Sequence, residues 1–286
     1  MNKTYVLYNV NASNGTVKES IKLLYPIIKE EVSYVDMTKI TSYQNFFQGL
    51  TKNNKVIICG GDGTLNRFVN DTKNVKIETP LYYFACGTGN DFYRELAPLA
   101  ENGILNIDDY VVNLPKVKID GKEFLFINGI GYGIDGYCCQ EGERLRKEKN
   151  KKINYAGIAI KGMFSTYKPT SAKIIVDGKE YKFDNVWLAS TMNGKYYGGG
   201  MMPTPMQERL AKDGEEKKIS ILVFHCKNKL KTLMIFPSLF KGEHVKKEKN
   251  ATILSGKCID VYFNSPRPLQ VDGEVVPDVI HYTATA

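Results

Sequence analysis

The sequence of 286 residues lacks the patterns that mark several classes of protein. It has three scattered histidines, His225, His244 and His281, and six cysteines with no CxxC pair. This spacing indicates neither a zinc site nor a disulfide framework, so we expect reduced, mostly buried thiols. No apolar run approaches the ~20 residues that a membrane-spanning helix needs. We therefore expect any contact with a membrane to be peripheral.

The amino-terminal residues show no signal-peptide pattern, because Met1-Asn2-Lys3 leads straight into a strand-like run. The composition, 43% hydrophobic and 24% charged, is ordinary for a globular protein. The missing signal-peptide pattern, together with the lack of a membrane-length apolar run, predicts a cytoplasmic protein. The net charge of +8 favours anionic partners, namely nucleotides, nucleic acid or an anionic membrane surface, without choosing among them.

The first part of the chain alternates between strand and helix patterns. The strand-like runs are residues 4–10, 31–37, 56–59 and 81–85, and helical spacing follows each of the first three. Such alternation with short connections predicts an α/β domain with a parallel, doubly wound sheet. In these folds, ligands bind at the carboxyl ends of the strands.

After about residue 112 the pattern changes to many short strands. Asp-Gly hairpin signals stand at 120–121, 177–178 and 272–273. They predict a β-rich, sandwich-like second domain.

The two patterns set the predicted domain limits. We place the α/β domain at 1–113 and the β domain at 114–275, and we expect residues 276–286 to complete the first domain. A helical insertion is expected near 135–165. Its charge run, 144–152, indicates a solvated helix end or loop, with a membrane-facing role as the alternative.

The stretch Val56–Asn66, VIICGGDGTLN, joins a buried strand to a helix through a glycine turn. Glycines let the backbone approach a ligand, and a helix N-terminus favours phosphate. Asp62 would repel a bare phosphate but suits one that carries Mg²⁺. An ordinary tight turn is the alternative for one such loop. Because Cys86–Asp91, CGTGND, repeats the same recipe after the next strand, we favour a phosphate site.

A second chemical signal lies near the carboxyl terminus, at Asp272-Gly273-Glu274. An alcohol does not lose its proton unaided near pH 7, so phosphoryl transfer to a hydroxyl needs a carboxylate within reach. In an extended segment, Asp272 and Glu274 would share one face. The alternative is an Asp-Gly hairpin with a solvated glutamate.

The ordered pair of glycine loops resembles the diacylglycerol kinase catalytic family, which includes bacterial soluble lipid kinases and sphingosine kinases. The resemblance covers nearly the whole chain, through the segments Asn9–Gly15, Gly60–Asn66, Gly87–Asp91, Asn193–Gly200, Asp213–Gly214 and Leu269–Glu274. The chain departs from the family at Val10, where a proline is usual, and at Arg67, where bacterial members usually have glutamate.

The resemblance implies a two-domain kinase with its active site in the interdomain cleft, MgATP as phosphoryl donor and the hydroxyl of diacylglycerol or a similar lipid as acceptor. It implies that Glu274 accepts the proton, with Asp272 and Asp62 as further catalytic candidates. It implies Mg²⁺ at Asp213, helped by the carbonyls of Leu210 and Glu215. The implied ATP contacts are Asn9, Val10, Asn11, Ala12, Ser13, Thr38, Gly60, Gly61, Asp62, Gly63, Thr64, Leu65, Asn66, Thr88, Asn90 and Asp91.

Two other functions stay open at this point, a kinase of the same superfamily acting on a soluble acceptor such as NAD, and a non-catalytic lipid- or nucleotide-binding protein. The expected partners are a lipid substrate and an anionic membrane surface at the inner face, not nucleic acid. A homodimer is left open. A GxGxxG pattern at Gly131–Gly136 could suggest NAD(P), but we expect its glycines to serve close packing.

An apolar set at helical spacing falls within the predicted insertion. Its members are Tyr155, Ile158, Ile160, Met163, Phe164 and Tyr167. This spacing favours core packing, with an acyl-chain pocket as the alternative. The lysine-rich segments 227–231 and 241–249 suit either solvent or anionic lipid.

Overall fold

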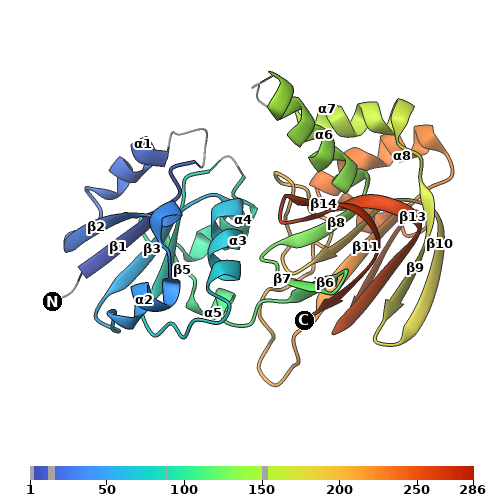
Figure 1. Cartoon of the computed structure of the whole chain (residues 1–286). Coiled ribbons are helices and arrows are strands. Elements are labelled where there is room, and N and C mark those ends of the chain that lie inside the picture. The colour runs from blue at the N-terminus through green and yellow to red at the C-terminus, as the bar shows by residue number, and fades with distance from the viewer. Residues whose placement is uncertain (1–2, 12–16, 88, 150–153) are drawn as a thin grey trace. The chain divides into compact units, whose positions relative to one another are not determined.

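The computed structural model describes residues 3–11, 17–87, 89–149 and 154–286. The chain divides into two compact units, Met1–Leu114 and Pro115–Ala286, which Figure 1 draws from blue to red along the chain. Each unit is a continuous stretch of sequence with hydrophobic clusters of its own.

The first unit is built on a five-stranded sheet in the order β2-β1-β3-β4-β5. Its strands are β1 Lys3–Tyr8, β2 Glu31–Asp36, β3 Lys55–Gly60, β4 Leu81–Ala85 and β5 Ile104–Asn106. The first four strands pair in parallel, and β5 pairs antiparallel with β4 at the edge. The structure thus confirms the predicted α/β domain and adds an antiparallel edge strand.

Short helices connect these strands. They are α1 Val17–Ile21, η2 Lys22–Leu24, η3 Met37–Lys39, α2 Tyr43–Gln48, α3 Asp62–Asp71, α4 Asp91–Leu96, η4 Ala97–Leu99 and α5 Asp108–Val111. The sequence supplies the N-cap of α2, where the Ser42 hydroxyl accepts a hydrogen bond from the Asn45 N–H. Val6, Val17 and Ile57 are buried together, so α1 packs its apolar face on the sheet.

The second unit consists of a nine-stranded sheet that folds over itself. Its strands are β6 Lys116–Ile119, β7 Lys122–Leu125, β8 Gly129–Gly133, β9 Thr170–Val176, β10 Lys179–Met192, β11 Ile219–His225, β12 Ala251–Gly256, β13 Cys258–Val271 and β14 Glu274–Thr285. Hairpins form at Asp120-Gly121, Asp177-Gly178 and Asp272-Gly273, where all six residues have positive φ, as the Asp-Gly signals predicted.

The two longest strands, β10 and β13, each take part in two layers. The first half of each pairs with β9, and the second half of each pairs with β8. Register shifts at Val186/Leu188 and between Tyr262 and Leu269 mark the crossings. Ile174, Ile221 and Val261 are fully buried in one shared cluster, so the unit is sandwich-like, as predicted.

Helices pack against the face of β8, β10 and β11 that points away from this shared cluster. They are α6 Ile134–Lys149, α7 Tyr155–Lys161, the π-helical η5 Gly162–Thr166, α8 Lys229–Ile235, η6 Phe236–Phe240 and η7 Glu243–Lys246. Met163, Trp187, Leu222 and Phe236 are buried in this second cluster. The prediction that the apolar residues of the insertion pack in the core is therefore confirmed for Met163 and Tyr167. Ile160 and Phe164, by contrast, are exposed.

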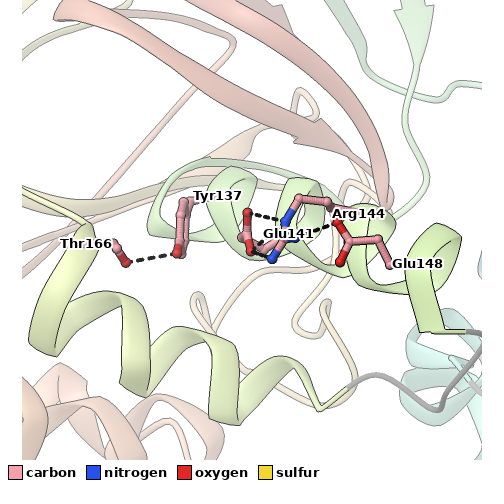
Figure 2. Close-up of polar contacts among 5 residues, drawn as sticks. All are labelled: Tyr137, Glu141, Arg144, Glu148 and Thr166. Carbon is pink, nitrogen blue, oxygen red and sulfur yellow. Dashed lines mark hydrogen bonds and ion pairs between the residues drawn. The ribbon is translucent and has the colours of Figure 1, made fainter.

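The charge run on α6 is partly paired on the helix itself. Figure 2 shows the Arg144 guanidinium between Glu141 and Glu148, with donor–acceptor distances of 2.9 Å from Nη2 to Glu141 Oε2 and 2.6 Å from Nη1 to Glu148 Oε1. The Tyr137 and Thr166 hydroxyls share a hydrogen bond of 2.9 Å, which ties α6 to η5.

One sequence-based expectation is wrong, and another is confirmed. Residues 276–286 do not complete the first domain, because β14 pairs along β13 and β6 within the second unit. The GxGxxG segment forms the buried strand β8 and the start of α6, and its glycines serve close packing. A Cβ on Gly136 would lie 1.9 Å from the Pro268 carbonyl oxygen, and one on Gly131 only 1.5 Å from Asp135 Oδ2.

Candidate active site

The predicted nucleotide residues of the first unit gather at one edge of its sheet. Parallel pairing aligns the carboxyl ends of β2, β1, β3 and β4, which lead into Thr38, Asn9, Gly61 and Cys86 respectively. The strand order changes direction between β1 and β3, and in doubly wound sheets ligands bind at such a switch point. Ala12, Ser13 and Thr88 lie outside the described residues.

The two glycine loops interlock through their backbones. The Cys86 N–H donates to the Gly60 carbonyl at 2.9 Å, and the Asp62 N–H donates to the Gly89 carbonyl at 3.0 Å. A Cβ on Gly87 would lie 2.5 Å from Gly61 Cα, so only glycine lets the two loops come this close. The loops therefore form one rigid platform at the ends of β3 and β4.

Asp62 fastens this platform. Its Oδ2 accepts from the Asp91 N–H at 2.7 Å and its Oδ1 from the Phe92 N–H at 3.2 Å, so it satisfies two backbone donors at the start of α4. This observation assigns Asp62 a structural contact between the loops. Because both carboxylate oxygens of Asp62 accept backbone donors, we expect Asp62 to affect catalysis through the position of the loops.

The other loops of this edge are held by local hydrogen bonds. The Asn11 N–H donates to Asn9 Oδ1 at 2.9 Å. Thr38 donates its N–H and its hydroxyl to Asp36 Oδ1 at 3.0 and 2.8 Å. Although burial opposes it, these hydrogen bonds lower the pKa of the Asp36 carboxyl, which keeps it ionised. Arg67 lies on the exposed side of α3 and pairs with Asp71 at 3.5 Å.

Two cysteines lie directly beneath the glycine loops. All six cysteines are free thiols, as expected, and Cys59 Sγ lies 3.1 Å from Cys86 Sγ. The hydrogen bond between them and burial raise the pKa of Cys59, and the same bond lowers the pKa of Cys86. Cys59 therefore stays a neutral thiol inside the sheet.

In the second unit, Asp272 holds a backbone segment that comes from far away in the sequence. Its carboxylate accepts N–H donors from Ile127 at 2.5 Å and from Asn128 and Gly129 at 2.9 Å each. The φ angles of Asp272 and Gly273 are 46° and 95°, so this segment is a hairpin turn and not the extended segment that would place Asp272 and Glu274 on one face. Glu274 begins β14 and is exposed.

The sequence reasoning missed Arg209, which holds the same segment from its carbonyl side. Its guanidinium donates to the Ile127 carbonyl at 2.5 Å and to Asn128 Oδ1 at 2.7 Å, and Arg209 is only 4% exposed. Asn193 Nδ2 donates to the same Ile127 carbonyl at 3.0 Å. Nothing near Arg209 in the sequence indicates this contact. A buried arginine within a polar loop is visible only in the fold.

Positive charge accumulates around Arg209. Lys217 is half-buried, and burial, together with the neighbouring Arg209 charge, lowers its pKa to about 8. At neutral pH the site therefore carries two cations, one of which loses its proton more readily than a surface lysine.

The predicted metal residues lie on one exposed loop. Asp213 and Gly214 form a turn closed by the Glu215 N–H on the Lys212 carbonyl at 2.9 Å, and Leu210 is 40% exposed. Within the described part of the chain, no group of three or more His, Cys, Asp or Glu could hold a metal ion. One carboxylate with backbone carbonyls is nevertheless a donor set that fits Mg²⁺, which retains water ligands and uses substrate phosphates.

Glycine loops at the carboxyl ends of parallel strands are suited to bind phosphate groups. The comparison with known families agrees. Residues 3–113 match the diacylglycerol kinase catalytic domain, and residues 128–283 match the YegS C-terminal NAD kinase beta sandwich-like domain. The chain therefore belongs to the diacylglycerol kinase catalytic family and is a kinase by class.

Individual relatives are distant. The chain is 24% identical over 243 residues to the Bacillus subtilis (strain 168) protein named "Putative lipid kinase YtlR". The aligned region covers 78% of this chain and 74% of that one. It is 27% identical over 204 residues to a protein of Mycobacterium tuberculosis named diacylglycerol kinase, which covers 69% of this chain and 63% of that one.

The fold is similar to that of a solved structure. A crystal structure from Bacillus anthracis str. Sterne, described as that of a "putative diacylglycerol kinase", superposes with a TM-score of 0.67 at 20% identity. The superposition covers 99% of this chain and 91% of that one. At this identity the likeness establishes the two-domain fold alone.

Proposed function

We propose that this protein transfers the γ-phosphoryl group of MgATP to the hydroxyl of diacylglycerol or a similar lipid, which gives a phosphatidic-acid-type product. The observation that carries this proposal is the interlocked pair of glycine loops at the sheet edge, in a chain of the diacylglycerol kinase family. ATP would lie along these loops and beside Asn9–Asn11 and Thr38. Bound Mg²⁺ would neutralise charge on the phosphates.

The residues of the second unit take the other roles in this proposal. Asp213, with the carbonyls of Leu210 and Glu215, would hold Mg²⁺. Glu274 would accept the proton of the lipid hydroxyl. Its carboxylate makes no hydrogen bond or ion pair with the described part of the chain, whereas both Asp272 oxygens accept backbone donors. A base needs a free lone pair, which favours Glu274 over Asp272.

The lipid acceptor places the enzyme at a membrane surface. Among the described residues, no helix is both long enough and apolar enough to cross a membrane. The excess of lysine supports peripheral contact with anionic lipid at the inner membrane face.

Glu274→Ala tests the assignment of the base. We expect phosphoryl transfer to diacylglycerol in mixed micelles to fall about 10²–10⁴-fold, because the hydroxyl then has no proton acceptor. ATP affinity, measured by calorimetry, should not change. Asp278→Asn is the matched control, because it removes another exposed carboxylate from the same strand and should leave transfer unchanged.

The same assay decides the acceptor. Labelled ATP is offered with diacylglycerol, with sphingosine and with NAD, since the second domain matches a family named after NAD kinase. Robust phosphorylation of NAD without any lipid product would replace the lipid proposal. Unchanged transfer in Glu274→Ala would remove Glu274 as the base, and absence of transfer to every acceptor would favour a binding protein.

A further inference from the structure

The second unit carries an exposed apolar face that its own core does not use. Ile160 and Phe164, four residues apart on α7 and η5, are 47% and 59% exposed. Leu230 and Met234, four residues apart on α8, are 67% and 75% exposed. A spacing of four places each pair on one side of its helix, so each pair forms a short apolar ridge.

These ridges are not an unfilled part of the core. The inward positions of the same helices are occupied, because Ala159, Met163, Ile235 and Phe236 are buried in one shared cluster. That cluster joins α7 and η5 to α8, and Figure 1 shows α7 and α8 at the same end of the second unit. We use the name α7–α8 face for these four exposed residues, Ile160, Phe164, Leu230 and Met234.

The neighbouring helix α6 holds this face in place. The Tyr137–Thr166 hydrogen bond of 2.9 Å ties α6 to the end of η5 (Figure 2). Arg144 of α6 is paired with Glu141 and Glu148, so its charge is balanced locally. The arrangement presents the apolar side chains on a fixed support.

Exposed lysines are next to two of these apolar side chains in the sequence. Lys161 follows Ile160 in the chain, and Lys229 and Lys231 flank Leu230, all of them exposed. Residues 227–249 contain seven lysines and only two acidic residues, Glu243 and Glu248. This segment therefore has a strong positive charge next to exposed apolar groups.

Charge and composition together select the occupant. The interfaces between proteins are depleted in lysine, whereas apolar side chains ringed by lysine suit the boundary between lipid headgroups and acyl chains. Lysine near a membrane gains from the negative potential of anionic lipids. The apolar ridges would enter between the headgroups while the lysine ammonium groups contact phosphate.

We propose that the α7–α8 face, with Lys161, Lys229 and Lys231, is the surface through which the protein docks on a bilayer that contains anionic phospholipid. The biological purpose of this docking rests on the proposed function, since the lipid acceptor lies in the bilayer. The binding itself does not need catalysis and can be measured without ATP.

The test uses sedimentation of the full chain with vesicles, in the absence of nucleotide. Vesicles of phosphatidylcholine with about one third phosphatidylglycerol should bind the protein, and binding should weaken with salt. Leu230→Ser/Met234→Ser should lower the partition coefficient about tenfold or more, because the apolar groups that enter the bilayer are removed. Lys229→Gln/Lys231→Gln should lower binding to the anionic vesicles to a similar degree.

Leu23→Ser/Leu99→Ser is the matched control, because these leucines of the first unit are 62% and 61% exposed. It should bind the vesicles like the wild type. Thermal unfolding of every variant should match that of the wild type, since none of the replaced side chains is buried. The proposal is overturned if the wild type and both α7–α8 face variants bind vesicles equally. It is also overturned if the Leu23→Ser/Leu99→Ser control loses as much binding as those variants do.

Two further readouts separate this proposal from its rivals. Phosphorylation of a water-soluble, short-chain diacylglycerol should be unchanged in Leu230→Ser/Met234→Ser. If even the wild type fails with this acceptor, the proposed function fails while the vesicle result stands. If the wild type self-associates in light scattering and Leu230→Ser/Met234→Ser does not, the face joins two copies of the chain and the docking proposal is overturned.

Discussion

Asp135 is a carboxylic acid enclosed beside the hairpin that carries Asp272 and Glu274. Its carboxyl is surrounded by protein, although the residue as a whole keeps some exposure, and Oδ2 accepts from Gln270 Nε2 at 2.9 Å. Gln270 Oε1 in turn accepts from the Gly273 N–H at 2.6 Å. Burial raises the pKa of Asp135 to about 6. The charge state of Asp135 is therefore linked to the hairpin turn.

This raised pKa predicts a dependence of stability on pH. The folded state holds the proton more tightly than the unfolded chain, whose Asp pKa is about 3.9, so the stabilisation is complete below about pH 4. It is lost as the pH rises to about 6, and on the order of 2–3 kcal/mol of unfolding free energy goes with it.

Urea unfolding across this pH range measures the effect as a difference between wild type and Asp135→Asn. The comparison is needed because other carboxyls act in the opposite direction. The hydrogen bond from Lys55, for example, lowers the pKa of Glu30 to about 2. Asparagine keeps an oxygen for Gln270 and cannot titrate, so the difference in stability should change with pH. A constant difference would show that Asp135 does not hold the proton.

Individual residues also show which features can be predicted from the sequence and which cannot. The Asp-Gly pair at 272–273 predicted a hairpin, because only local geometry is involved. The partners of Asp272 lie 143 to 145 positions away, so no local pattern could reveal them. Arg209 was missed for the same reason. Asp62 was identified as important, but its contacts with Asp91 and Phe92 depend on how two loops meet.

Among the elements, the two glycine loops depend on each other most directly. Gly87→Ala would place a methyl group 2.5 Å from Gly61 Cα and 2.9 Å from Gly61 N. Backbone atoms cannot turn aside, so the loops must separate. We expect a loss of about 1–3 kcal/mol in unfolding free energy. Displacement of the loops should also lower ATP affinity by about tenfold to a hundredfold.

Gly49→Ala is the matched control for this loop variant. Gly49 lies in the same unit, at the end of α2 with φ of −90°, and a Cβ there would meet nothing within 4 Å. Both stability and ATP affinity should stay near the wild-type values, as measured by urea unfolding and calorimetry. Equal ATP affinity in Gly87→Ala and the wild type would show that the interlocked loops do not hold the nucleotide.

Strands that follow simple patterns were predicted well, and strands shaped by packing were not. The four parallel strands of the first unit were visible as apolar runs between helices. Strand β8 was not, because three of its five residues, Gly129, Gly131 and Gly133, are glycine, a residue that is depleted in strands. Strands β10 and β13 each cross between layers through an irregular segment, so the sequence pattern of each resembles two short strands.

At the scale of the molecule, the chain passes from one unit to the other at a single point, between Leu114 and Pro115. Because β14 stays in the second unit, each unit is a continuous segment with its own buried clusters. The sequence indicated the two units through the change from alternating to strand-only patterns. It misplaced the last segment because Pro277-Asp278 interrupts the apolar run there and weakens the strand signal.

Continuous units with separate cores predict two calorimetric transitions on heating. MgATP should raise the transition of Met1–Leu114 most, by roughly 10 °C at a hundredfold excess over its dissociation constant, because the proposed ATP contacts belong to that unit and the second unit supplies only the proposed Mg²⁺ residues. Gly87→Ala should lower the same transition and leave the other in place. A single transition that moves as a whole with MgATP would instead mean that the two units unfold together, with the nucleotide stabilising both.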